Sequence, residues 1–264
     1  SASYAFDSSC AMGEGGWCLA GGRWYWAGEG GALLTGWRRV GGSWYWMDPS
    51  TGAMRTGLAE IGSYRYYLTA SGAMATGWAR DASEGCWYYA SPDGNLLTGW
   101  QLVGGRWYWM DGATARMQTG WLDRPEGSYY LTVSGAMASS QLVEVDGQKF
   151  WFGPDGTSRS GWADTGAGRF WFDGSTSSAR HPEVTGRLSI DGKTYYIDPA
   201  SGLAMNKWID NEDGSRSWAE ADGSLFGSLR EGVLTLDGGA TANGWVAIAG
   251  KTFYADANGR LANG

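Results

Sequence analysis

The stretch Gly36–Gly57, "GWRRVGGSWYWMDPSTGAMRTG", places Trp37, Trp44 and Trp46 close together in sequence. A second stretch, Gly99–Gly120, reads "GWQLVGGRWYWMDGATARMQTG" and repeats the same skeleton. In both, two short β-prone runs flank a Gly-Gly pair, which predicts a β-hairpin with a type I′ or II′ turn. The segment that follows contains turn formers such as Pro and Gly, and we expect it to carry the chain to the next hairpin.

The same unit recurs along the whole chain with a spacing of about 20–22 residues. Aligning on the Gly-Trp step gives Trp17, Trp37, Trp78, Trp100, Trp121, Trp162, Trp208 and Trp245, with Leu58 and Leu142 where a Trp is missing. A single two-stranded hairpin is marginally stable in water, whereas hairpins stacked in series bury their aromatic faces against one another. No sustained helical periodicity is present. The sequence therefore predicts an all-β solenoid of stacked β-hairpins built from about 20–22-residue repeats.

The repeats are not equally regular. We expect an N-terminal lead-in over residues 1–15 and well-preserved aromatic hairpins over 16–174. The run "DGSTSSARHPEVTG" breaks the spacing, which predicts a Ser-rich insertion or bend over 175–185. Degenerate hairpin repeats are expected over 186–264.

Composition excludes several classes of protein. The chain has 264 residues, with 18 Trp, 45 Gly and a net charge of -7. That charge disfavours nucleic-acid binding, because phosphates require Lys and Arg. No apolar run approaches the roughly 18 residues that indicate a membrane span. The chain opens with "SASYAFDSSC", with neither Met nor an apolar leader, and we expect it to be a processed or excised fragment of a larger protein.

The cysteines give one structural expectation. Cys10 and Cys18 are close enough in sequence to bridge across a turn, with Cys86 left over. The alternative is three unpaired thiols. Three Cys with one His do not make a zinc site, and we expect no metal or other cofactor.

Nothing in the sequence indicates catalysis. His181 is the only histidine and lies in the Ser-rich insertion, where we expect a solvated loop side chain. No nucleophile elbow, phosphate loop or His-rich metal motif is present. The acidic residues fall mostly in turns, and "DNEDG" (210–214) lacks the spacing of a calcium loop. We therefore expect a protein that is not an enzyme. An active site in the degenerate C-terminal half is the alternative.

The pattern of Gly-Trp, six residues, Trp-Tyr-aromatic and then Gly-x-Met-x-Thr-Gly-Trp resembles the cell-wall-binding repeat of choline-binding modules. It is also similar to the glucan-binding repeats of glucosyltransferases and to the receptor-binding repeats of clostridial toxins. The likeness runs from about Gly16 to Gly264. It is close in "GWCLAGGRWYW", "GWRRVGGSWYWMD", "GAMATGW" and "GWQLVGGRWYWMD", and fragmentary beyond about Thr185.

This resemblance implies a ligand held between successive hairpins, in a box of about three aromatic rings with a Met at the rim. Carried over by position, the boxes would be Trp37 and Trp44 with Tyr67 and Met54; Trp100 and Trp107 with Tyr130 and Met117; Trp17 and Trp24 with Trp46; and Trp78 and Trp87 with Trp109. In the last two boxes Leu33 and Leu96 replace the Met.

The physical chemistry of aromatic rings supports such a box. A quaternary ammonium is attracted to ring faces by roughly 0.5–2 kcal/mol per contact. Several weak sites on one chain give avidity for a polymer. Rings in a shallow groove also stack on sugars, so a polysaccharide ligand remains open.

Some aromatic positions are expected to be structural, and some boxes incomplete. Tyr45 faces away from Trp44 and Trp46 on its strand, so Tyr45-type positions should form the core between hairpins. Arg65 and Ser128 stand where other repeats have a Trp, and neither box should hold a cation. Trp162 with Phe170 and Tyr196 is a further candidate site.

The sequence thus predicts a non-catalytic binding module, secreted and associated with the bacterial cell surface. The expected partner is a cell-envelope polymer that carries choline, of the teichoic-acid type. The first alternative is a polysaccharide, either a glucan or a host glycan. The second is a structural stalk or spacer in which all of the rings are core residues.

Overall fold

The computed structural model describes residues 15–175, 179–237 and 239–262. Within these ranges the regular secondary structure is β-strand, apart from one short 3-10 turn, η1 (Glu29–Gly31). The chain forms two compact units, Ser1–Gly120 with Leu131–Met137 and Trp121–Tyr130 with Ala138–Gly264. Among the described residues, no helix has the length and apolar character needed to cross a membrane.

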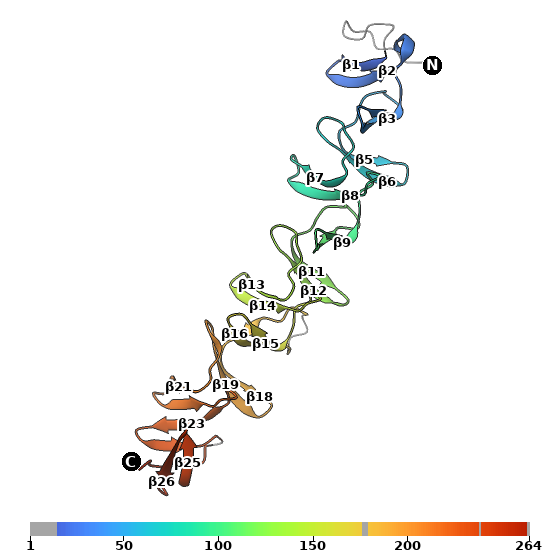
Figure 1. Cartoon of the computed structure of the whole chain (residues 1–264). Coiled ribbons are helices and arrows are strands. Elements are labelled where there is room, and N and C mark those ends of the chain that lie inside the picture. The colour runs from blue at the N-terminus through green and yellow to red at the C-terminus, as the bar shows by residue number, and fades with distance from the viewer. Residues whose placement is uncertain (1–14, 176–178, 238, 263–264) are drawn as a thin grey trace. The chain divides into compact units, whose positions relative to one another are not determined.

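The first unit is a series of antiparallel hairpins that follow one another in chain order (Figure 1). Its paired strands are β1 (Gly16–Ala20) with β2 (Arg23–Ala27), β3 (Gly36–Val40) with β4 (Ser43–Met47), β5 (Gly57–Ile61) with β6 (Tyr64–Leu68), β7 (Gly77–Asp81) with β8 (Cys86–Ala90), and β9 (Gly99–Val103) with β10 (Arg106–Met110).

The hairpin turns have the predicted geometry. Between β3 and β4, Gly41 and Gly42 have φ values of 57° and 88°. A positive φ at both central residues is the requirement of a type I′ turn, and glycine meets it without steric cost. The turn sets the register that pairs Trp37 with Trp46 and Arg39 with Trp44.

The linker after each hairpin joins that hairpin to the one before it. In the linker after β4, the Arg55 amide donates to the Trp46 carbonyl of its own hairpin at 2.9 Å. The neighbouring Met54 amide donates to the Trp24 carbonyl of the previous hairpin at 2.7 Å. The next linker repeats this contact, from the Met74 amide to the Trp44 carbonyl at 2.7 Å. These bonds stack the hairpins and satisfy linker backbone groups that would otherwise lose water.

The Gly-x-Met pattern of the linkers has a packing cause. Gly72 has a φ of 82°, and a Cβ at this position would overlap the sulfur of Met54 from the preceding linker. Gly94 stands in the same relation to Met74, and Gly135 to Met117. These three linker glycines therefore make room for the methionine of the linker before each of them.

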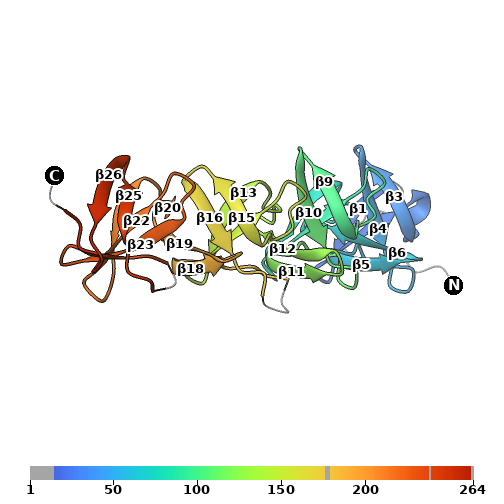
Figure 2. The ribbon, with the colours of Figure 1, turned by 90° about the horizontal axis from the view of Figure 1, so that it is seen from below.

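The second unit continues the hairpin pattern with larger sheets (Figure 2). Its hairpins are β11 (Gly120–Arg124) with β12 (Gly127–Leu131), β13 (Gln141–Val145) with β14 (Gln148–Phe152), β15 (Gly161–Thr165) with β16 (Gly168–Phe172), and β25 (Gly244–Ile248) with β26 (Lys251–Ala255). Strand β17 (Glu183–Val184) adds to β16, and β20 (Gly202–Leu203) adds to the pair β18 (Gly186–Ile190) and β19 (Lys193–Asp198). A four-stranded sheet contains β21 (Lys207–Asp210), β22 (Arg216–Ala219), β23 (Leu225–Arg230) and β24 (Val233–Thr235).

The core of this unit consists of small clusters between neighbouring hairpins. Phe152, Phe170, Phe172 and Ile197 are fully buried in these clusters. Burying each such side chain contributes about 1.5–3 kcal/mol. The prediction of an all-β solenoid of stacked hairpins is confirmed.

Two local expectations differ from the structure. His181 is half-buried rather than solvated: its Nδ1 lies 2.8 Å from the Asp173 carbonyl oxygen, and its amide donates to Ser158 Oγ at 3.1 Å. Cys18 is disulfide-bonded and Cys86 is a free thiol, so the alternative of three unpaired thiols is wrong. The other half of the predicted pair, Cys10, lies outside the described residues.

Candidate functional site: aromatic boxes between hairpins

Three clusters of the first unit share one arrangement of rings, which we call boxes A, B and C. Each contains two Trp residues of one hairpin, a Tyr of the next hairpin and a Met of the linker after that. The residues are Trp17, Trp24, Tyr45 and Met54 in box A; Trp37, Trp44, Tyr66 and Met74 in box B; and Trp78, Trp87, Tyr108 and Met117 in box C.

The ring geometry is nearly the same in all three boxes. The first Trp lies edge-to-face with the second, with centroids 6.2, 6.3 and 6.2 Å apart in boxes A, B and C. The first Trp also lies edge-to-face with the Tyr, with centroids 4.8, 4.9 and 4.8 Å apart. Such near-perpendicular rings form two walls of a corner.

The second Trp of each box is unusually exposed for its size. Trp24, Trp44 and Trp87 are 44%, 41% and 39% exposed. A tryptophan of a folded chain is highly buried on average, so ring surface that repeatedly stays open to solvent is informative. The hairpin twist and the strand register hold these rings at the edge of the inter-hairpin gap.

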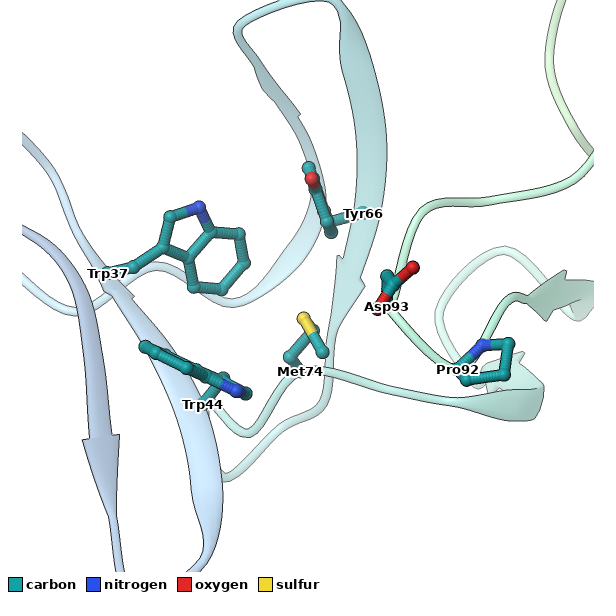
Figure 3. A pocket seen from close by; sticks show the side chains of 6 residues that line it. All are labelled: Trp37, Trp44, Tyr66, Met74, Pro92 and Asp93. Carbon is teal, nitrogen blue, oxygen red and sulfur yellow. The ribbon is translucent and has the colours of Figure 1, made fainter.

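Boxes A and B enclose cavities of about 340 and 310 Å³. In box B the rings of Trp37, Trp44 and Tyr66 and the Met74 thioether face one space (Figure 3). Pro92 and the carboxylate of Asp93 complete its lining. Box A has Ser71 at the comparable edge. No Lys or Arg lines either cavity.

The grouping of the box residues differs from the sequence prediction by one position along the strand. Tyr67 was expected beside Trp37, but Tyr66 occupies that place. Tyr67 is instead buried, stacked on Tyr88 with centroids 5.4 Å apart. The same shift replaces Trp46 by Tyr45 in box A and Trp109 by Tyr108 in box C. Trp46 and Trp109 lie against Trp37 and Trp100 of their own hairpins.

The cause is the alternation of side chains along a strand. A hairpin's paired Trp residues face the following hairpin, so its middle Tyr faces the preceding one. The expectation that Tyr45-type residues are only core is therefore wrong: Tyr45 lines the cavity of box A.

The methionine is also shifted, by one linker. Met54 was expected to close the box of Trp37, but it lines the cavity of Trp17 and Trp24. Met117 was expected beside Trp100, but its amide donates to the carbonyl of Trp87 in box C at 2.7 Å. Met74, which sequence reasoning omitted, lines box B. Leu33 and Leu96 consequently do not take the place of a methionine in boxes A and C.

Trp100 and Trp107 repeat the first two rings of a box. Their centroids are 6.4 Å apart at 85°, and the Met137 amide donates to the Trp107 carbonyl at 2.8 Å. Tyr130, the expected third ring, packs in the second unit against Trp121 and Phe152, with centroids 5.5 and 6.3 Å away. It occupies the Trp46-type position of its hairpin.

Two other repeats, those of Arg65 and Arg169, have arginine where the boxes have their second Trp. Arg65 lines a cavity of about 340 Å³ and is paired with Glu60 at 3.1 Å. In the second unit, the guanidinium of Arg169 lies 5.0 Å from the ring centroid of Trp162. The third ring at Trp162 is Tyr195, at 5.2 Å, rather than the expected Tyr196.

Two further aromatic residues of the second unit are also in contact with other protein groups. Phe170, expected to contact a ligand, is fully buried. On the hairpin of β21 and β22, the guanidinium of Arg216 lies 5.8 Å from the ring centroid of Trp208.

The missed Tyr positions did carry a sequence signal. The residue that follows the second Trp position is aromatic in successive repeats, even where the flanking Trp residues are lost: Tyr25, Tyr45, Tyr66, Tyr88, Tyr108, Tyr129, Phe150, Phe170 and Tyr195. A position that stays aromatic while its neighbours change indicates a contact with the adjoining repeat.

The boxes have the composition of a cation site or a sugar platform. Ring faces attract a weakly hydrated cation, and exposed rings stack on the apolar faces of sugars. Among the described residues, no group of three or more His, Cys, Asp or Glu could hold a metal ion.

Comparison with known proteins agrees with this architecture. Residues 35–54, 76–96, 98–112 and 243–261 match the choline-binding family described as "Putative cell wall binding repeat". Over 152 residues the chain is 29% identical to Glucosyltransferase-S of Streptococcus mutans, covering 55% of this chain. The chain spans only 10% of the length of that relative.

Two solved structures from Streptococcus pneumoniae share the fold. The modular autolysin LytC aligns with a TM-score of 0.59 at 21% identity, over 91% of this chain and 51% of its own. CbpJ aligns with a TM-score of 0.51 at 18% identity, over 94% of both chains. Four segments of this chain thus match the cell wall binding repeat of the choline-binding family, and the chain folds as serial hairpins.

Proposed function

We propose that this chain is a non-catalytic module that attaches a bacterial protein to the cell envelope by binding choline groups on a teichoic-acid-like polymer. The observation that carries the proposal is the threefold recurrence of one box, with two Trp rings, a Tyr ring and a Met in matching geometry. A set of rings with only a core function would not need the second Trp to stay exposed in each repeat. The matched repeats of the choline-binding family support the same ligand.

The charge of the site supports a cation. The Asp93 carboxylate at box B complements a quaternary ammonium, and the cavities of boxes A and B have no Lys or Arg in their lining. Three ring contacts of roughly 0.5–2 kcal/mol give only a few kcal/mol, which corresponds to about millimolar affinity. Several boxes on one chain convert that weak affinity into firm retention on a polymer that carries many choline groups. A module of this kind acts outside the cell, as a secreted protein bound to the surface.

A polysaccharide ligand is the second candidate. It is favoured by the similarity to Glucosyltransferase-S, since a glucan is a substrate or product that such an enzyme could retain. The exposed rings of Trp24, Trp44 and Trp87 could stack on sugar faces as well as on a cation.

Competitive elution of the chain from a choline-bearing matrix distinguishes a choline ligand from a polysaccharide ligand. The immobilised chain should be released by millimolar choline and much less by 3,3-dimethylbutan-1-ol, which has a neutral carbon in place of the ammonium nitrogen. The reason is that ring faces attract the charge itself. Equal release by the two compounds, or release by an oligosaccharide alone, would contradict choline recognition.

A variant pair ties the effect to the boxes. Trp44→Ala should weaken the choline-induced change in Trp fluorescence, whereas Tyr64→Ala should leave it unchanged. Both rings are well exposed, so neither change opens a core, but only Trp44 lines box B.

A further inference from the structure

A cavity of about 730 Å³ lies in the second unit, between the β18–β19 hairpin and the four-stranded sheet β21–β24. This volume is within the roughly 300–1,000 Å³ typical of small-ligand sites. It is more than twice the volume of box A or box B. Its lining is polar rather than aromatic, so it is a different kind of site.

The cavity occupies the position of a box whose rings have all been replaced. In the β18–β19 register, Arg187 pairs with Tyr196 just as Trp37 pairs with Trp46. Ser217, opposite Ile209 on the next hairpin, stands where Tyr45 completes box A. Loss of these rings opens the inter-hairpin gap, and the added hairpin β23–β24 supplies a further wall through Ser228 and Thr235.

A fixed network of polar side chains forms one wall. Arg187 Nη2 donates to Ser217 Oγ at 2.7 Å and also to Asn211 Oδ1. Asn211 Nδ2 donates to Ser215 Oγ at 2.7 Å and to Ser217 Oγ at 3.2 Å. Ser215 and Ser217 are 3% and 1% exposed. Buried polar groups in a satisfied network hold one arrangement, which is the condition for a specific polar site.

The charges around the cavity select among ligand classes. Asp210, Glu212, Asp213 and Asp237 line it, with Arg187 as the cation among the lining residues. The Ser215 hydroxyl lowers the pKa of Asp213, which keeps this carboxylate ionised as a hydrogen-bond acceptor. Such a lining repels phosphate and other anions. It matches a ligand whose hydroxyl groups both donate to carboxylates and accept from a guanidinium.

The half-buried ring of Tyr196 adds an apolar surface to the same lining. An aromatic face beside convergent carboxylate and guanidinium groups fits a pyranose ring, which has one apolar face and a rim of hydroxyls. We infer that this cavity binds a neutral hexopyranose unit of a glycan, separately from boxes A, B and C. The chain would then hold two kinds of site, one aromatic for the choline group and one polar for sugar.

The inference is tested by NMR titration of the whole chain with isomaltotriose, laminaritriose and tri-N-acetylchitotriose. At least one of these neutral trisaccharides should shift resonances of Asn211 and Tyr196, with an affinity of about millimolar. Saturating choline should not reduce the effect, because the cavity shares no residue with boxes A and B. This independence separates the result from the choline proposal, since either can fail alone.

Variants at the rim provide the matched comparison. Arg187→Met keeps the aliphatic stem but removes the guanidinium, and should weaken trisaccharide binding by about tenfold or more. Asp237→Asn, an isosteric change at an exposed position, should weaken it as well. Arg260→Met, an exposed arginine of the same unit outside the lining, is the control. The inference is overturned if no trisaccharide shifts these resonances up to about 50 mM. It is equally overturned if the shifts map to the box rings and disappear with choline.

Discussion

The guanidinium of Arg180 lies 4.6 Å from the ring centroid of Trp121, although the two residues are far apart in the sequence. Asp123 accepts hydrogen bonds from Arg180 Nη2 at 2.6 Å and from its Nε at 3.2 Å. Trp121 and Phe150 lie edge-to-face with centroids 4.8 Å apart, as the first Trp and the Tyr do in boxes A to C. The chain's own cation thus lies on the ring that, in those boxes, faces an open space.

Replacing Arg180 should open this position. In Arg180→Ala we expect choline to raise the melting temperature of the second unit more than it does in the unchanged chain, because Trp121 and Phe150 then face a vacated space. Without choline, the variant should lose about 1 kcal/mol of unfolding free energy from the cation–π contact and the partly exposed ion pair. Calorimetry with and without choline measures both effects.

The control for this change is Arg159→Ala. Arg159 forms a 2.7 Å ion pair with Asp155, and both side chains are about half exposed. It should show no gain in choline response. An equal response of the two variants to choline would mean that Trp121 is not a latent cation position.

Tyr66 and Tyr67 should differ sharply in their effect on choline binding. Tyr66→Ala removes the third ring of box B and should weaken that site by several-fold. Tyr67→Phe keeps the ring that stacks on Tyr88 and removes only the hydroxyl, which donates to the Arg80 carbonyl at 3.2 Å. It should leave choline binding unchanged while costing about 1 kcal/mol of stability. Fluorescence titration and thermal melting of both variants provide the comparison. A loss of choline response in Tyr67→Phe would mean that Tyr67, and not Tyr66, is the third ring of box B.

The sequence was sufficient to predict the individual hairpins. It was insufficient to predict which residues of neighbouring hairpins contact one another. Gly41 and Gly42 define a turn, and the turn fixes the register of Trp37 against Trp46, so hairpins and repeat length follow from short-range rules. Alternation also shows that Tyr45 faces away from Trp44. It does not show which hairpin Tyr45 faces, because that depends on the order of stacking.

Two other contacts that the sequence could not reveal also join residues that are far apart in the chain. Met54 reaches box A because its amide bonds to Trp24 across a whole hairpin. Arg180 reaches Trp121 from an insertion that has no counterpart in the other repeats. Neither contact leaves a periodic signal, so neither could be read from spacing alone.

The variant Arg65→Ala tests whether an inter-hairpin gap that lacks the second Trp contributes to choline binding. Arg65→Ala should leave retention on a choline matrix unchanged, because the aligned positions offer Leu58 and Arg65 in place of two rings. The loss of the Glu60 ion pair should cost little, since Glu60 is well exposed. Column retention beside Trp37→Ala, which should elute earlier, gives the measurement. Weaker retention of Arg65→Ala than of Trp37→Ala would place the ligand in a different gap.

Gly72→Ala should damage box A without touching its rings. A Cβ at Gly72 would overlap Met54 Sδ, and the φ of 82° is unfavourable for alanine. We expect a loss of about 1–3 kcal/mol in stability and a weaker choline response at box A. Gly57→Ala is the matched control, because its φ of 76° is similar but a Cβ there has open space around it. The control should lose stability but keep the choline response, as measured by melting and fluorescence titration. A normal choline response in Gly72→Ala would show that the position of Met54 does not affect the site.

Asp48 should contribute to stability in a defined range of pH. Its carboxylate accepts hydrogen bonds from the Ser50 hydroxyl at 2.5 Å and from the Ser50 and Thr51 amides at 3.0 Å each, and these lower its pKa from 3.8 to about 2. A group whose pKa is lower in the folded chain stabilises that chain above its unfolded pKa, and the contribution disappears as the pH falls through the folded pKa. The linker turn between β4 and β5 should therefore lose this support between about pH 4 and about pH 2.

Asp48→Ala should lower the melting temperature at pH 7 and have little effect at pH 2. Glu29→Gln, which removes an exposed carboxylate of the same unit, should show a small difference at both pH values. Melting curves of the three proteins by near-ultraviolet circular dichroism measure the differences. A melting difference for Asp48→Ala that stays constant from pH 7 to pH 2 would mean that the ionised carboxylate does not hold the turn.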